Sequence, residues 1–295
     1  LMDVLAQLEY RGYDSAGIAT VHDNAIHRCR ATGKLINLRD KLAVSPIDGM
    51  VGIGHTRWAT HGLPTRENAH PHATDKVAVV HNGIIENFNE LRAELQAAGH
   101  RFTSQTDTEV VPQLITYYLN QGKSPREALS ATLKRLEGAF ALGIIFADAP
   151  EAIYAARLGS PLAIGLGAGE NYLGSDAVAL APLTNKICYL NEGDWAEICT
   201  DGVTIFDKND QVVERPYKIS SASGATTGKG DYRHYMLKEI YEQPSVIGQT
   251  LNVYYNPTTS RVVMPELPFS LSSIERITIV ACGTSYYAGL AARYW

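Results

Sequence analysis

The sequence is poor in cysteine, and its few cysteines are scattered. Only four occur among 295 residues. They are Cys29, Cys188, Cys199 and Cys282. No two stand at C-x-x-C spacing, which excludes the usual zinc-ribbon and redox motifs. So few cysteines in a chain of this length are typical of a reducing compartment, and we expect a cytoplasmic protein.

The sequence also lacks long apolar runs and an excess of positive charge. No stretch approaches the roughly 20 apolar residues that a membrane-spanning helix needs. The net charge is −5 and the pI is near 6.0, so the basic surface of a nucleic-acid-binding protein is missing. We therefore expect neither a membrane nor a nucleic-acid partner, and the 45% hydrophobic composition is that of a globular protein.

Both ends of the sequence resemble the interior of a helix. Leu1, Val4, Leu5 and Leu8 recur at helical spacing, and no N-cap residue precedes them. Residues 290–295 likewise form a helix-like run. We expect a chain that is truncated at both ends.

The first two thirds of the chain combine helices with short strands. Residues 51–56 and 77–82 are predicted strands, and 86–98 is a predicted helix before Gly99. A second helix is predicted from about Thr108, and a third from Ser124, whose Ser-Pro-Arg-Glu sequence is a capping box, with Gly138 as its end. Further strands are predicted at 139–148, 152–157, 161–166, 187–190, 195–200 and 203–207. Their close spacing favours antiparallel pairing, and the grouped helices indicate a layered α+β domain.

The last third reads as a linker and the start of another domain. Residues 216–231 are small and polar, which is typical of a linker. A helix is predicted over 232–243, ending at Pro244. A strand over 276–282, a turn at 283–285 and a helix from Tyr286 would open an α/β domain.

Histidines cluster in one segment, since five of the nine lie between residues 55 and 81. A metal site is not indicated, because no nearby Asp, Glu or Cys completes a ligand set, and no cofactor is expected. The segment from His55 to Gly62 reads instead as a substrate loop. Arg57 can hold a carboxylate in a bidentate manner, and Trp58 offers a flat apolar cover. The alternative is an ordinary surface loop with a buried tryptophan.

Three further motifs each allow two interpretations. Asn82–Gly83 is either a hairpin turn or an oxyanion hole. Asp107 is either a helix cap, which local sequence favours, or a group that binds an ammonium. The segment from Cys282 to Ser285 is either a structural turn or an anion cradle at a helix N-terminus.

These motifs together resemble those of the glucosamine-6-phosphate synthase family, the isomerizing glutamine–fructose-6-phosphate aminotransferases. They occur in the family's order and span nearly the whole chain. The matching segments are residues 8–17, 55–62 (His-Thr-Arg-Trp-Ala-Thr-His-Gly), 68–72, 81–87, 106–110, 233–236, 238–244 and 281–285.

The resemblance implies three parts. Residues 1–215 would be a glutaminase domain with the four-layer α/β/β/α sandwich of N-terminal-nucleophile hydrolases. Residues 216–246 would be a linker and linker helix, and 247–295 the beginning of an α/β sugar-isomerase domain. The implied activity is glutamine hydrolysis with transfer of ammonia to fructose 6-phosphate, giving glucosamine 6-phosphate and glutamate, in a homodimer when full length.

The resemblance also assigns residue roles. Asn82 and Gly83 would form the oxyanion hole, and Arg11 would lie near the nucleophile. Glutamine would be bound by Arg57, Trp58, Thr60, His61, His70 and Asp107. Thr284 and Ser285 would bind the sugar phosphate.

The nucleophile that this chemistry needs is a first-residue cysteine, which would precede Leu1. We therefore expect the chain alone to be inactive, with a free sheet edge where the strand bearing that cysteine would lie. Two alternatives are an amidophosphoribosyltransferase, which segments 238–244 and 282–285 argue against, and a non-catalytic sugar-phosphate-binding regulatory protein.

Overall fold

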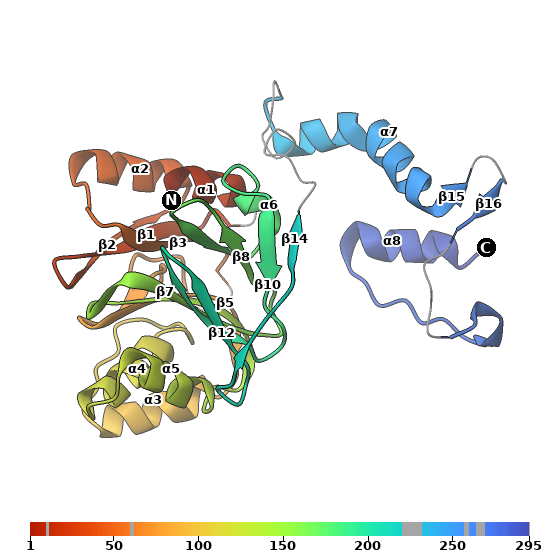
Figure 1. The fold of residues 1–295 in the computed structure, drawn as a ribbon. Helices are drawn as coiled ribbons and strands as arrows, with labels where there is room; N and C mark the ends of the chain where they lie inside the picture. The colour runs from red at the N-terminus through yellow and green to blue at the C-terminus, as the bar shows by residue number, and fades with distance from the viewer. Residues whose placement is uncertain (10–11, 60–61, 220–231, 257–259, 264–268, 295) are drawn as a thin grey trace. The chain divides into compact units, whose positions relative to one another are not determined.

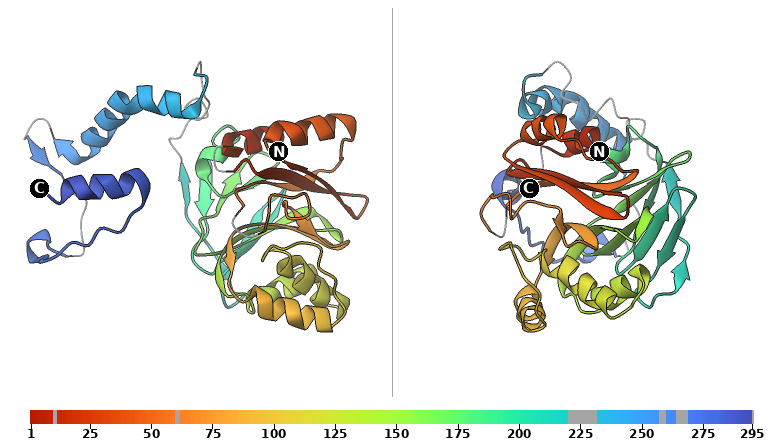
Figure 2. Two further views of the ribbon diagram at one scale, coloured as in Figure 1. Left: turned by 180° about the vertical axis from the view of Figure 1, so that it is seen from behind. Right: turned by 90° about the vertical axis from the view of Figure 1, so that its left-hand side faces the viewer.

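A computed structural model describes the chain except residues 10–11, 60–61, 220–231, 257–259, 264–268 and 295. The chain divides into two compact units, Leu1–Gly228 and Lys229–Trp295, which are described separately. Among the described residues, no helix is long and apolar enough to cross a membrane. The first unit places two layers of sheet between two layers of helix (Figures 1 and 2).

One sheet layer contains two antiparallel sheets. The first has the order β2-β1-β3, and α1 (Met2–Leu8) and α2 (Leu35–Val44) pack on it through Leu5, Leu35 and Leu38. The second has the order β14-β10-β8-β9, and the short α6 (Ala177–Leu180) packs on it. Their strands are β1 (Ser15–His22), β2 (Ala25–Thr32), β3 (Val51–Arg57), β8 (Ala163–Leu166), β9 (Asn171–Gly174), β10 (Lys186–Tyr189) and β14 (Tyr217–Ile219).

The other sheet layer is a seven-stranded sheet of order β13-β12-β11-β7-β6-β5-β4. Every pairing in it is antiparallel, as the strand spacing predicted. Its strands are β4 (His72–Ala73), β5 (Val77–Ile85), β6 (Gly138–Phe146), β7 (Ala149–Leu158), β11 (Trp195–Cys199), β12 (Val203–Phe206) and β13 (Val212–Val213). Helices α3 (Phe88–Ala97), α4 (Val110–Asn120) and α5 (Pro125–Leu133) cover its outer face (Figure 1).

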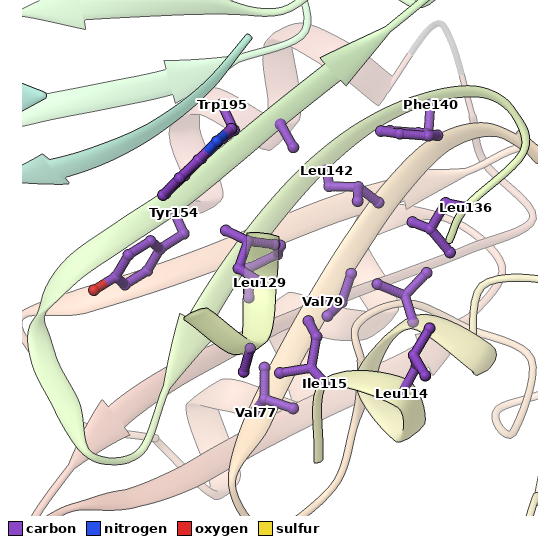
Figure 3. Close-up of a cluster of buried hydrophobic side chains, with 14 of the residues drawn as sticks. Val77, Val79, Leu114, Ile115, Leu129, Leu136, Phe140, Leu142, Tyr154 and Trp195 are labelled. Carbon is purple, nitrogen blue, oxygen red and sulfur yellow. The ribbon is translucent and has the colours of Figure 1, made fainter. Parts of the chain in front are cut away.

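The largest core lies between this sheet and those helices. Because successive side chains of a strand point to opposite faces, Val77 and Val79 of β5 face the helices together with Leu142 of β6 (Figure 3). The intervening residues face the other sheet layer, and several are small, such as Ala78 and Ala141. The four-layer α/β/β/α arrangement predicted for residues 1–215 is therefore present.

The local sequence signal at Ser124 correctly predicts the start of α5. The Ser124 hydroxyl accepts the Glu127 N–H, and the Ser124 N–H donates to the Glu127 carboxylate at 2.9 Å, so the predicted capping box forms. One prediction about the end of this helix is wrong. Helix α5 ends at Leu133, and Gly138 opens strand β6 instead of ending the helix.

The hairpin β1–β2 was not predicted. Its turn is Asp23–Asn24, and both residues adopt positive φ angles of 49° and 55°. This conformation is tolerated by Asn and Asp at modest cost. Strand β2 lies at an edge of its sheet and alternates polar with apolar residues only weakly, which explains why the pattern was missed.

The second unit contains α7 (Tyr235–Tyr254), the strand pair β15 (Tyr255–Asn256) and β16 (Arg261–Val262), and α8 (Gly283–Ala292). Helix α7 continues through Pro244, so the predicted end at that residue is wrong. A proline in a helix leaves the carbonyl four residues earlier without its partner, and the exposed position of Ile240 lets water satisfy that group.

Residues 276–282 form no strand, contrary to prediction, and α8 begins at Gly283 instead of Tyr286. A strand needs a neighbouring strand to pair with, and none of the described residues provides one here. The start of a sugar-isomerase domain over 247–295 stays a prediction. Within the predicted linker, residues 217–219 form β14 of the first unit, and 220–231 lie outside the described residues.

Candidate active site

A cavity of about 940 Å³ is lined on one side by β3 and on another by β9. Each of these strands is at the edge of its sheet, with no partner beyond it among the described strands. The cavity is further lined by inward-facing residues of the seven-stranded sheet, including Val80, Ala141, Gly143 and Ile153. Two edge strands thus line one cavity, whose surface is partly polar and partly apolar.

The polar part of this cavity contains most of the predicted glutamine site. The structure brings together Arg57, Trp58, His70, Asn82, Gly83 and Asp107. Arg11, Thr60 and His61 lie outside the described residues. Thr284 and Ser285 are exposed in the first turn of α8, in the second unit.

Asn82 and Gly83 lie inside β5, opposite Ala141 and Phe140 of β6. The hairpin-turn interpretation of this pair is therefore wrong. Gly83 has φ +129°, and a Cβ there would lie 2.0 Å from the carbonyl oxygen of Ala139. Only glycine fits this position, and the exposed Asn82 side chain reaches the cavity beside it. A side-chain amide and a neighbouring backbone N–H are a suitable pair of donors for a developing oxyanion.

Asp107 does not cap a helix. Helix α4 has Glu109 at its N-cap position, without a side-chain capping bond, which corrects the interpretation favoured by local sequence. The Asp107 carboxylate is buried and accepts the Ile85 N–H at 2.9 Å. A buried carboxylate held by a backbone donor at the cavity wall is a suitable partner for an ammonium group.

Arg57 is buried at the end of β3, with 4% of its surface exposed. Its guanidinium donates to the carbonyls of Gly62 and Leu63, each at 3.4 Å, which fastens the following loop. Burial lowers the pKa of Arg57, and the nearby carboxylates of Asp14 and Asp107 oppose that shift. The site therefore pairs one buried cation with carboxylates.

Trp58 begins the loop and is 56% exposed. Its ring meets Tyr13 edge to face, with centroids 5.3 Å apart. The alternative of a surface loop with a buried tryptophan is therefore wrong. An exposed indole at the mouth of a cavity can cover a small ligand.

Four histidines pack at the same end of the cavity. His55 stacks on His70, with ring centroids 4.3 Å apart, and His70 meets His72 edge to face. The His81 N–H donates to Nδ1 of His70. Burial lowers the pKa of His55 to about 4, and it holds the pKa values of His70 and His72 well below the usual range. Among the described residues, no group of three His, Cys, Asp or Glu side chains could hold a metal ion.

Sequence reasoning missed the side chains that hold the loop before β4. Arg28 of β2 donates to the Pro71 carbonyl at 3.0 Å, and Arg30 donates to the carbonyls of Glu67 and Ala69. The Asn68 amide donates to the Leu63 carbonyl. The available signal was the spacing of the two arginines, since residues two apart in a strand share one face.

None of the three cysteines of the first unit is placed to attack at Asn82–Gly83. Cys199 lines the cavity, and burial raises the pKa of its thiol. The strand register places Asn82 opposite Ala141, Ala141 opposite Arg157, and Trp195 opposite Ala156. Cys199 is thus three strands away and roughly 16 Å further along the sheet, at about 3.3 Å per residue. Cys29 and Cys188 do not line the cavity, and Cys282 is in the second unit.

Comparison with known proteins shows what the part of the chain that holds these residues is similar to. Residues 55–182 match the sequence model of the glutamine amidotransferase domain family. The chain carries a glutamine amidotransferase domain. The matched range contains Arg57 at the end of β3, Asn82–Gly83 within β5, and Asp107 shortly before α4.

The chain is homologous over its whole length to isomerizing glutamine–fructose-6-phosphate aminotransferases. It is 58% identical to the one from Zymomonas mobilis over 295 residues, which are 100% of this chain and 49% of that protein. It is 53% identical to the one from Brucella abortus, again over 100% of this chain and 49% of that protein. The chain thus spans about half the length of these curated relatives.

Solved structures agree on the fold. The glutamine phosphoribosylpyrophosphate amidotransferase from B. subtilis superposes with a TM-score of 0.61 at 24% identity, covering 72% of this chain and 46% of that one. This likeness supports the N-terminal-nucleophile glutaminase sandwich. The identity to this amidotransferase is lower than the identity to the aminotransferase relatives and covers only part of the chain, so the amidophosphoribosyltransferase alternative is not favoured. The comparisons do not favour the non-catalytic alternative either.

Proposed function

We propose that this chain is the glutamine-hydrolysing part of a glutamine–fructose-6-phosphate aminotransferase, which forms glucosamine 6-phosphate and glutamate. The observation that carries the proposal is that Asn82–Gly83, Arg57 and Asp107 line one cavity. A glutamine whose carboxylate meets Arg57 and whose ammonium meets Asp107 directs its side-chain amide towards Asn82–Gly83. Trp58 and His70 line this cavity. The family resemblance supports glutamine-binding roles for Thr60 and His61 as well, and a role for Arg11 beside the nucleophile.

The chemistry follows from that placement. A thiolate attacks the amide carbon of the glutamine side chain, and the electron pair moves to the amide oxygen. Asn82 and Gly83 donate hydrogen bonds to this oxyanion. Ammonia leaves as the thioester forms, and water then hydrolyses the thioester to glutamate and restores the thiol. The ammonia passes to fructose 6-phosphate.

The nucleophile is a cysteine at the head of an apolar strand that precedes Leu1. Its own α-amine serves as the base. The cavity lined by the unpaired edges of β3 and β9 supports this assignment, because an added strand there would gain partners on both sides. In this proposal the protein is cytoplasmic, and glutamine hydrolysis depends on that preceding cysteine.

The second unit contributes to the sugar site. Thr284 and Ser285 lie in the first turn of α8, where unpaired backbone N–H groups favour a phosphate. Residues 216–246 link the two functions, and 247–295 begin the sugar-isomerase domain of a homodimeric full-length enzyme.

The test uses three proteins: the chain alone, the chain preceded by an apolar strand that begins with cysteine, and the same extension beginning with serine. We expect glutamate release from glutamine only with the cysteine form. Asn82→Ala in that form should lower turnover by roughly 10²–10³, as for other oxyanion donors. Release by the chain alone, or none from a correctly folded cysteine form, would contradict the proposal.

A further inference from the structure

His55 contacts the side chain that the proposed reaction depends on. It lies on β3, and its Nε2 atom is 2.7 Å from Oδ1 of Asn82 on β5. The two residues belong to different sheet layers and meet at the cavity that both line. The contact therefore joins the two layers at the proposed oxyanion hole.

The proton of the His55 ring belongs on Nε2. A neutral imidazole carries one proton, and its tautomer is set by the hydrogen bonds of the two nitrogens. The His81 backbone acts on the ring as a hydrogen-bonding neighbour that raises the pKa of His55, but it meets the buried Nδ1 atom only in poor geometry, which is costly for a buried donor. A proton on Nε2 instead meets the Asn82 oxygen at 2.7 Å.

Neighbouring histidines hold the His55 ring in place. It stacks on His70 with an interplanar angle of 20°. The His81 N–H fixes His70, and His72 contacts the Thr106 hydroxyl at 3.1 Å. Burial, together with His81 and Arg57, lowers the pKa of His55 to about 4, so the ring is neutral near pH 7.

The side-chain amide of an asparagine takes one orientation only when a hydrogen-bond partner selects it. Its terminal torsion is broad and roughly two-fold, so an untethered Asn82 would present its oxygen to the oxyanion as readily as its NH₂ group. A hydrogen-bond donor that contacts the Asn82 oxygen disfavours the orientation in which this oxygen would face the oxyanion and repel it. The remaining NH₂ group is then free to donate within the cavity.

We infer that His55 is a positioning residue, which by donating Nε2–H to the oxygen of Asn82 turns the amide NH₂ group towards the side-chain amide of bound glutamine. This inference rests on the proposed function, because it presumes that Asn82 serves glutamine hydrolysis. His55 does not touch the substrate. It acts only through Asn82.

Kinetics in the cysteine-headed form separate this role from simple packing. His55→Phe keeps a ring on His70 but removes the donor, whereas the Nε2 of His55→Gln can replace the ring Nε2. We expect His55→Phe to lower kcat for glutamine roughly tenfold, a part of the loss for a missing oxyanion donor, with KM changed less than threefold. His55→Gln should retain kcat within about threefold of the wild type.

A double-mutant cycle provides the decisive comparison. If His55 acts through Asn82, then His55→Phe should cost less than about twofold in an Asn82→Ala background, because coupled residues are not additive. Additive losses, an equal loss in His55→Gln, or a change in KM alone would overturn the inference.

Nuclear magnetic resonance of the ¹⁵N-labelled chain tests the hydrogen bond without any activity. We expect the ¹⁵N shifts of His55 to report the Nε2–H tautomer at pH 7, and the Asn82 side-chain NH₂ resonances to move in His55→Phe but little in His55→Gln. An Nδ1–H tautomer would overturn the inference. A correctly folded cysteine-headed wild type without glutaminase activity would instead reject the proposed function, and the two failures are thereby distinguished.

Discussion

The two faces of the seven-stranded sheet are packed very differently. On the outer face, Leu142 and Ile144 of β6 are fully buried, and so is Leu114 of the covering helix α4. On the inner face, Ala141 and Gly143 leave space, and Val80 is only partly buried at the cavity. The apolar side chains of the outer face are closely packed, which stabilises the fold. Part of the inner face is less closely packed, and there it lines a cavity with buried polar groups.

The strand β5 belongs to both faces, and its Gly83 should show the largest effect. Gly83→Ala introduces a Cβ that would lie 2.0 Å from the Ala139 carbonyl, at φ +129°. We expect the free energy of unfolding of the chain to fall by roughly 4 kcal/mol, the range of severe backbone conflicts. Urea denaturation followed by circular dichroism measures it.

Gly99→Ala is the matched control for this substitution. Gly99 also has a positive φ, +89°, but a Cβ there would meet nothing within 4 Å. It should cost only about 1 kcal/mol, the strain of the left-handed conformation alone. Equal losses in the two variants would show that the contact with Ala139 is unimportant.

The sequence predicted the outer face far better than the inner one. The apolar, β-rich run in residues 77–82 and the capping box at Ser124 are local signals, and the structure follows them in β5 and α5. The pairing of β1 with β3 joins residues far apart in the sequence. Neither strand periodicity nor turn chemistry specifies such a partner. The family resemblance implied the layers of the sandwich, but this pairing was not predicted.

In the site, too, local sequence signals were read correctly, whereas contacts between distant elements were missed. Arg57 and Asn82–Gly83 were visible as unusual residues at the ends of predicted strands. Asp107 was assigned to helix capping because the Ile85 N–H that it accepts comes from another element. His55 stood in a conspicuous motif, but its contact with Asn82 depends on two sheet layers meeting. Contacts across layers have no sequence period, which is why they were missed.

Matched leucine truncations measure the packing difference directly. Leu114 is fully buried in the outer core, and Leu173 of β9 is partly buried at the cavity. Leu114→Ala should lower the free energy of unfolding by about 3 kcal/mol, because the truncation creates a new void. Leu173→Ala should cost about 1 kcal/mol, since one side of that leucine already faces open space. Equal costs in urea denaturation would mean that the inner face is packed as tightly as the outer one.

Acid should lower the free energy of unfolding through the buried histidines of the inner face. The effect of each histidine should be smaller than that of the substitutions above. The pKa of His55 in the folded chain, about 4, is below the usual histidine value of 6.5. Between these two values the unfolded chain binds more protons, so stability contributed by neutral His55 is present above pH 6.5 and is lost as the pH falls towards 4. From pH 7 to pH 5.5 this loss amounts to about 1 kcal/mol for His55 alone.

His70 and His72 have pKa values lowered in the same direction, and they face His55 together with His81 and Arg57. Their losses therefore add to the acid sensitivity of the wild type, and His55→Gln should remove only the share of His55. Urea denaturation at pH 7 and pH 5.5 gives the change in the free energy of unfolding for each protein. The change in the wild type minus the change in the variant is the share of His55. An identical pH dependence in the two proteins would mean that His55 is protonated as readily in the folded chain as in the unfolded one. The ring would then be open to water, and the contrast between a dry, neutral histidine cluster and an open cavity beside it would not hold.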